Sequence, residues 1–156
     1  MDVLTLVLTG FVAWSILVSL YFTAHRLGWV ETLVIDRFPF RPAEDSRRVP
    51  VNLAIHFLAA CIFTLMYTSA WSLIGSHLHT NFLGIAILTG LIHGAAVAIG
   101  MIVYTSRQSD GMQQAVLVVG AHGVFGLVIG VSAMMMQHNL GTLDRMAGFY
   151  QQLILG

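Results

Sequence analysis

The sequence predicts an all-α integral membrane protein with four spanning helices, and two observations carry that prediction. Four apolar stretches of about twenty residues or more are separated by polar segments, and about twenty apolar residues form a helix long enough to cross a bilayer. Only 9% of the residues are charged and 57% are hydrophobic, whereas about 25% are charged in a soluble domain. The chain therefore lacks the charge that a water-facing surface needs.

The 156 residues suit one membrane domain, residues 1–156, without an appended soluble domain. The expected spans are residues 3–23, 51–74, 82–104 and 112–136. The formal net charge is zero, which argues against nucleic acid as a partner. Cys61 is the only cysteine, so the chain has neither an internal disulfide nor a multi-cysteine metal site.

Two further segments have apolar residues at intervals of three and four, which is typical of amphipathic helices. They cover residues 27–38 and 142–154, and we expect each to lie in a membrane interface. With the four spans they complete the predicted fold, a membrane four-helix bundle with an interfacial helix on each side.

The arginines predict the orientation of the chain. Five of the seven fall between the first and second spans, and Arg107 lies between the third and fourth. Because cytoplasmic loops are enriched in Arg and Lys, both termini are expected on the non-cytoplasmic side of a bacterial inner membrane. Arg145, in the C-terminal segment, is the one exception.

Three histidines, His56, His93 and His122, lie within successive spans beside small residues. An ionisable group at membrane depth is a candidate functional residue because hydrocarbon offers it no hydrogen bonds. His93 lies about 21 Å from Arg107 and His122 about 18 Å from Asp110, at 1.5 Å per helical residue. Their depths therefore match. The face of the second span that carries His56 also carries small and aromatic residues, Ala59, Ala60, Phe63, Tyr67 and Trp71 among them.

Three interpretations of these histidines stay open. His93 and His122, with or without His56, would bind a tetrapyrrole, haem b or a chlorophyll-type pigment, from opposite faces. They would otherwise relay protons or ions, although the spans contain no Asp, Glu, Arg or Lys between their ends. In the third interpretation each imidazole bonds a neighbouring hydroxyl or carbonyl and specifies helix pairing.

The third and fourth spans each contain a glycine pair at the four-residue spacing that lets helix backbones approach closely, Gly90 with Gly94 and Gly126 with Gly130. We expect these and other glycines of the two spans to pack the helices together: Gly90, Gly94, Gly100, Gly123, Gly126 and Gly130. A separate set of thioether and imidazole groups lies near the outer ends of the helices, and such ligands suit Cu(I). This alternative metal site would use His77, His79, Met136 and His138.

The segments Gly90-Leu-Ile-His93-Gly94 and Gly120-Ala-His122-Gly123 are similar to one another. In this pattern the chain resembles small four-span proteins of the bacterial inner membrane with His-Gly helices. The resemblance implies the fold and the location, and it implies no activity.

From these observations the function expected first is that of a non-enzymatic accessory subunit in a larger membrane complex, for example a redox or photosynthetic one. The small size, the glycine faces and the absence of a carboxylate pair for acid–base catalysis favour it. The lipid bilayer and other membrane subunits, or further copies of the chain, are the expected partners. The alternatives are a tetrapyrrole-binding subunit and, third, a transporter of small molecules or ions.

Overall fold

The computed structural model describes residues 3–31, 48–74, 82–105 and 111–155, with the side chains of 48–49, 72–74, 104–105 and 136–155 left out. These residues form four helices and no strand. The helices are α1 (Val3–Arg26), α3 (Arg48–Ile74), α4 (Phe82–Thr105) and α5 (Gly111–Leu155). Each contains a stretch long and apolar enough to cross a membrane. The all-α prediction and the four apolar helices are thus confirmed.

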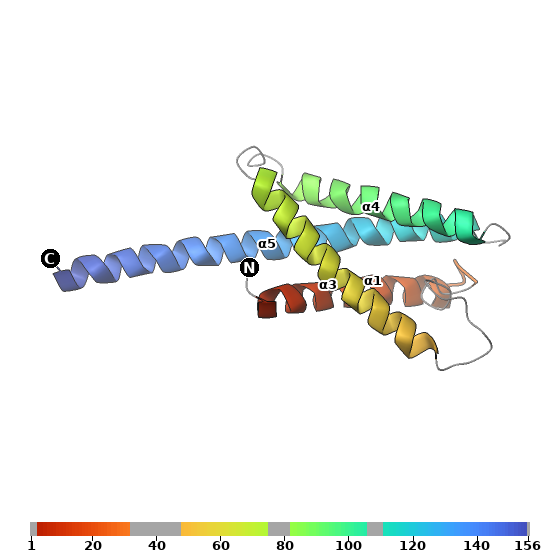
Figure 1. Ribbon diagram of the computed structural model, residues 1–156, viewed down its shortest axis with the longest axis horizontal. Coiled ribbons are helices and arrows are strands. Elements are labelled where there is room, and N and C mark those ends of the chain that lie inside the picture. Colours follow the sequence, from red (N-terminus) through yellow and green to blue (C-terminus); the bar gives the residue numbers. More distant parts are fainter. Residues whose placement is uncertain (1–2, 32–47, 75–81, 106–110, 156) are drawn as a thin grey trace.

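The helices alternate in direction along the chain (Figure 1). α4 and α5 lie side by side as an antiparallel pair, α1 packs against α5, and α3 crosses the others obliquely. The C-terminal ends of α1 and α4 therefore lie on one side of the molecule. The N-terminal ends of α3 and α5 lie on the same side. α5 is the most enclosed of the four helices, so it forms the centre of the packing.

Glycines bring the backbones of α4 and α5 into contact. A Cβ atom at Gly90 would collide with the carbonyl oxygen of His122, and one at Gly126 would collide with the carbonyl oxygen of Ala86. A Cβ atom at Gly94 would lie 2.8 Å from the Cα of Val119. These glycines therefore admit the opposite helix where any side chain would exclude it.

The remaining glycines differ from one another in their surroundings. A Cβ atom at Gly130 would lie 2.6 Å from the Cβ of Ala86, and one at Gly123 would lie 2.8 Å from the side chain of Leu91. Gly100, which the sequence analysis grouped with them, has no atom within 4 Å of that position. In the described part of the chain Gly100 takes no part in the α4–α5 contact, because its face of α4 points away from α5.

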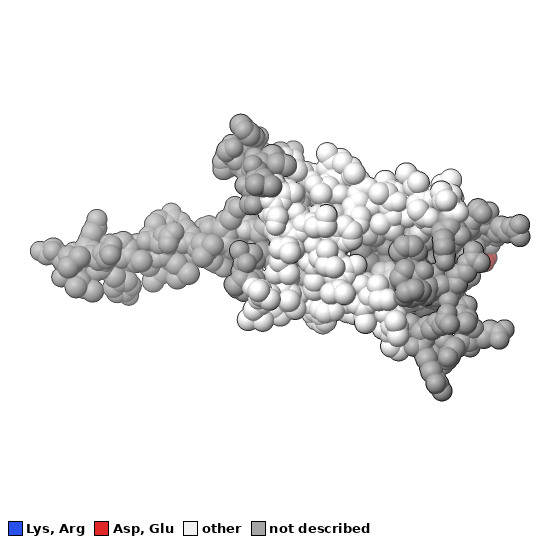
Figure 2. Space-filling model, in the orientation of Figure 1, with Lys and Arg blue, Asp and Glu red and all other residues white. Residues whose placement is uncertain are grey.

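The outer surfaces of the helices are apolar. Leu58 of α3 is 60% exposed, Ile92 of α4 63% and Val103 of α4 75%. On the face shown in Figure 2, the described residues include no Lys or Arg and only a small acidic patch at one end. Exposed apolar surface of this extent is unfavourable in water. It is the surface that a helix presents to lipid.

The first predicted interfacial helix, residues 27–38, does not begin as predicted. α1 ends at Arg26, and Gly28 takes a left-handed conformation with φ of 71°. The Gly28 N–H donates to the His25 carbonyl and the Trp29 N–H to the Ala24 carbonyl, each at 3.0 Å. This pair of bonds is the Schellman motif that ends helices at glycine. Residues 27–31 are therefore a turn, and residues 32–38 lie outside the described residues.

The second predicted interfacial helix, residues 142–154, is helical but is not a separate element. α5 runs without a break for 45 residues, which corresponds to roughly 67 Å at 1.5 Å per residue. Its C-terminal part extends beyond the ends of the other helices (Figure 1). The prediction of a boundary near residue 137 was wrong, because neither Asn139 nor Gly141 interrupts the helix.

Candidate functional site

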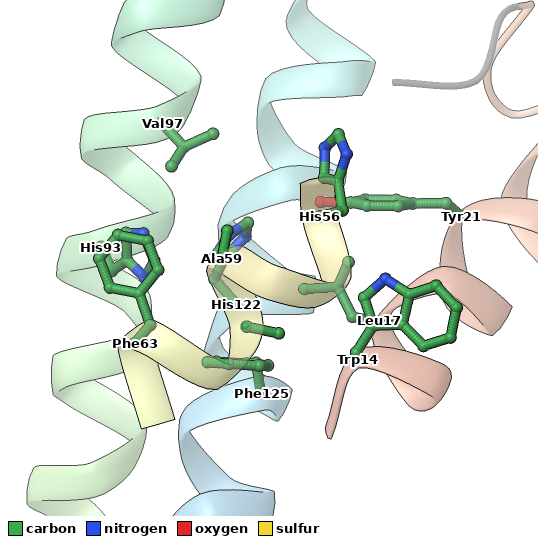
Figure 3. Close-up of a pocket in the computed structure, with 11 residues that line it drawn as sticks. Trp14, Leu17, Tyr21, His56, Ala59, Phe63, His93, Val97, His122 and Phe125 are labelled. Atoms are coloured by element: carbon green, nitrogen blue, oxygen red, sulfur yellow. The ribbon is translucent and has the colours of Figure 1, made fainter. Parts of the chain in front are cut away.

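The three histidines lie around one pocket between the helices (Figure 3). All four helices contribute to its wall, and its volume is about 120 Å³. The residues that line it are Trp14, Leu17, Tyr21, His56, Ala59, Ala60, Phe63, His93, Val97, His122 and Phe125. The structure thus places His56, His93 and His122 at a single site.

His93 and His122 are direct neighbours. Their ring centroids are 4.8 Å apart, and the ring planes are inclined at 76°. The glycine contact explains this closeness, since the backbone carbonyl of His122 lies against Gly90, one helical turn before His93. The same contact that joins α4 and α5 therefore brings the two imidazoles together.

Backbone hydrogen bonds fix the tautomers of two of the rings. His122 Nδ1 is 2.8 Å from the carbonyl oxygen of Val118, and His56 Nδ1 is 2.8 Å from that of Asn52. A carbonyl oxygen only accepts, so in both rings Nδ1 carries the hydrogen and donates it. In a neutral imidazole Nε2 then has a lone pair and is an acceptor. No described residue donates a hydrogen bond to Nε2 of His122.

His93 is held by aromatic side chains of α3. Its Nδ1 is 2.9 Å from the hydroxyl oxygen of Tyr67, and its ring centroid is 3.9 Å from that of Phe63. The Tyr67 hydroxyl also donates to the carbonyl oxygen of Thr89, at 3.4 Å. Because the hydroxyl hydrogen of Tyr67 is used in that bond, its oxygen can only accept from His93. His93 Nδ1 therefore carries a hydrogen and donates it to the hydroxyl oxygen. Nε2 of His93 is then an acceptor as well.

The Tyr67–His93 contact can be measured by a double-mutant cycle. Tyr67→Phe and His93→Leu are each expected to lower the free energy of unfolding by about 1–3 kcal/mol, because each leaves a buried polar partner unsatisfied. The double variant should lose less than the sum of the two, by about 0.5–1.5 kcal/mol. Unfolding in mixed micelles of increasing SDS content reports the three values.

Ser132→Ala is the matched control, since among the described residues the Ser132 hydroxyl bonds only the carbonyl of Val128 on its own helix, at 2.9 Å. A change within about 0.5 kcal/mol is expected for it. Strictly additive losses at Tyr67 and His93 would show that their contact contributes nothing to stability.

The arrangement leaves no space for a macrocycle between His93 and His122. An imidazole nitrogen binds a metal ion at about 2 Å, so two rings on opposite faces of a metal macrocycle have centroids roughly 6 Å apart or more. The observed separation is 4.8 Å, and the backbones of α4 and α5 are in contact at Gly90. The pocket, at about 120 Å³, is also well below the several hundred Å³ of typical cofactor sites.

In the described part of the chain no three His, Cys, Asp or Glu side chains are placed to hold a metal ion. The residues of the alternative copper site are not among those whose side chains the structure describes. His77 and His79 lie outside the described residues, and the side chains of Met136 and His138 are not described.

The contribution of α1 to the pocket was not anticipated, and it includes the polar side chains of Trp14 and Tyr21. With Leu17 they recur at intervals of three and four, which places them on one face of the helix. That spacing was the available signal. The indole Nε1 of Trp14 is buried and has no acceptor among the described residues, so one of the lining residues carries an unused hydrogen-bond donor.

The comparisons with known proteins add no family. No protein-family model, no curated protein and no solved structure matches the chain. The resemblance to four-span bacterial inner-membrane proteins therefore stays a prediction.

Proposed function

We propose that this chain is a multi-pass membrane protein of the bacterial inner membrane and a non-enzymatic accessory subunit of a larger membrane complex. The four apolar helices support the membrane assignment. Apart from Arg26 at the end of the first one, their membrane-length stretches contain no Asp, Glu, Lys or Arg. The pocket accordingly offers no carboxylate for acid–base catalysis beside its histidines.

The proposed orientation places both termini on the non-cytoplasmic side. The Arg26 end of α1 and the Arg48 end of α3 lie at one end of the molecule, where α4 also ends and α5 begins. A cytoplasmic location of that end agrees with the enrichment of arginine in cytoplasmic loops.

The observation that carries the accessory role is the length of α5. Its apolar stretch covers Gly111–Met135, and the helix continues to Leu155. The additional twenty residues are roughly 30 Å of helix, and no other described helix lies beside them (Figure 1). Helices in proteins gain most of their stability by packing an apolar face against a partner. Because α5 is continuous, this part points away from the bundle, where a neighbouring subunit can pack against it.

Removal of residues 137–156 tests the proposal. We expect the full-length chain, extracted with a mild detergent, to migrate in a native complex far larger than its own 17.0 kDa plus detergent. The truncated chain should still insert in the membrane, because all four apolar stretches remain. It should migrate alone, because the proposed contact is gone.

Migration of the full-length chain alone would contradict the accessory role. A complex that survives the truncation would place the contact elsewhere and would contradict the role of α5. A complex that contains only this chain would show that the chain associates with itself. Further copies of the chain would then be the partner that the proposal requires.

The two alternative functions receive less support from the geometry. A tetrapyrrole between His93 and His122 does not fit the observed ring separation of 4.8 Å. Transport of ions has the histidine pocket in its favour, but a coupled transporter normally needs a charged group at membrane depth, and none lines this pocket.

A further inference from the structure

We propose that the histidine pocket binds one hydroxylated aromatic ring of the phenol or hydroquinone type. This inference does not depend on the accessory role, since the pocket is formed by a single chain. The size of the pocket, the nature of its walls and its hydrogen-bonding groups each favour this class of ligand.

The volume fits a single ring. A cavity of about 150 Å³ in a protein interior binds benzene, and this pocket measures about 120 Å³. One six-membered ring therefore fits with small adjustments of the wall.

The walls are largely hydrocarbon and aromatic. Phe63 and Phe125 contribute aromatic rings, and Leu17 and Val97 contribute aliphatic side chains (Figure 3). A water molecule in a cavity needs two to four polar partners. Walls of this kind offer enough polar partners for only a few water molecules. Aromatic rings instead gain from offset or edge-to-face contact with other rings.

The hydrogen-bonding groups select a hydroxyl. The Nε2 atoms of His93 and His122 are acceptors and require a donor, which a ketone oxygen does not offer. The buried N–H of Trp14 lacks an acceptor among the described residues, and Figure 3 shows it on the edge of the indole toward Tyr21. A hydroxyl group donates to an imidazole and accepts from an indole. A carboxylate is disfavoured because none of the described residues that line the pocket is Lys or Arg.

Two sources could supply this chemistry, a membrane quinol with an isoprenoid tail or a small water-soluble phenol. The experiment titrates the purified full-length chain in lipid nanodiscs with hydroquinone, phenol and a prenylated hydroquinone by isothermal calorimetry. The comparison ligand is 1,4-dimethoxybenzene, which keeps the ring and its oxygens but has no hydroxyl to donate.

We expect saturable binding of the hydroxylated rings and about tenfold weaker binding of the dimethoxy ring, the change that one lost hydrogen bond brings. His122→Leu and Trp14→Phe should each weaken hydroquinone about tenfold for the same reason. Ala59→Leu should abolish binding by filling the pocket while leaving every polar group in place. The unfolding transition of each variant shows whether it is folded. The comparison of the four ligands on the unsubstituted chain tests the proposal even if a variant does not fold.

Tighter binding of the prenylated ring would identify the membrane quinol as the source, and equal binding would identify the soluble phenol. Absence of saturable binding by all three hydroxylated rings would overturn the proposal. Equal affinity for the dimethoxy ring would overturn it as well, because the histidines would then not select a hydroxyl. Neither result would alter the migration of the native complex, so the accessory role is tested separately.

Discussion

Gly90→Ala is expected to lower the free energy of unfolding by about 3 kcal/mol or more, the upper range for overpacking a close-packed interior. The added methyl group would collide with the carbonyl oxygen of His122, a backbone atom that no rotamer change can move. Gly126→Ala should behave in the same way, since its methyl group would collide with the carbonyl oxygen of Ala86. Because His122 belongs to the contact, separation of α4 from α5 should also disrupt the pocket.

The chain offers matched controls for this experiment. Gly100 lies on α4 and Gly120 on α5, and a Cβ atom at either would meet no atom within 4 Å. Alanine at these positions should be neutral or stabilising by up to about 1 kcal/mol, because it lowers the conformational entropy of the unfolded chain. SDS-induced unfolding of the four variants gives the comparison. Equal stabilities for the Gly90 and Gly100 variants would contradict a backbone contact at Gly90.

This contrast between glycines shows how far the sequence leads at the helix interface. The four-residue spacing of Gly90 with Gly94 and of Gly126 with Gly130 indicated close packing, and all four lie in the α4–α5 contact. Gly100 has a similar place in its span but faces away from α5. The spacing of residues gives the faces of a helix but does not say which face meets the neighbouring helix. Gly100 follows Gly94 by six residues, so the two glycines lie on different faces of α4.

The helix ends illustrate a second limit. His25 and Arg26 followed by Gly28 is a signal for the end of a helix, and α1 does end there. The apolar spacing that continues past this point favoured a helix where the chain makes a turn. At the other end of the chain, the amphipathic spacing of residues 142–154 was interpreted as a separate helix, but α5 is continuous from Gly111 to Leu155. An amphipathic pattern predicts a helix but not whether it joins its neighbour.

The candidate site was predictable in its histidines and not in its surroundings. Matched depth placed His93 and His122 near each other, and the face of His56 was expected to have space beside it. The sequence left open whether glycine faces a bound ring or a neighbouring backbone, because both use the same residue. In the structure Gly90 faces the backbone of α5. The contribution of Trp14 and Tyr21 required the position of α1, which no local pattern determines.

Phe125→Ala is expected to cost about 3–5 kcal/mol of unfolding free energy, the usual range when a buried aromatic side chain is truncated. Phe125 is 3% exposed and its ring packs between Tyr67 and His122, with centroids 6.1 and 6.3 Å away. Truncation would leave a void beside the pocket that lipid chains cannot fill, and the lining atoms would lose their dispersion contacts. Ile92→Ala is the control.

Ile92 is 63% exposed on α4, so its truncation should change the stability by no more than about 0.5 kcal/mol. Both variants are compared by unfolding in the same detergent. A loss at Phe125 as small as that at Ile92 would mean that the pocket wall is open to lipid. In that case the histidines would lie in a groove on the surface of the bundle, since Phe125 is the residue of α5 that adjoins both Tyr67 and His122.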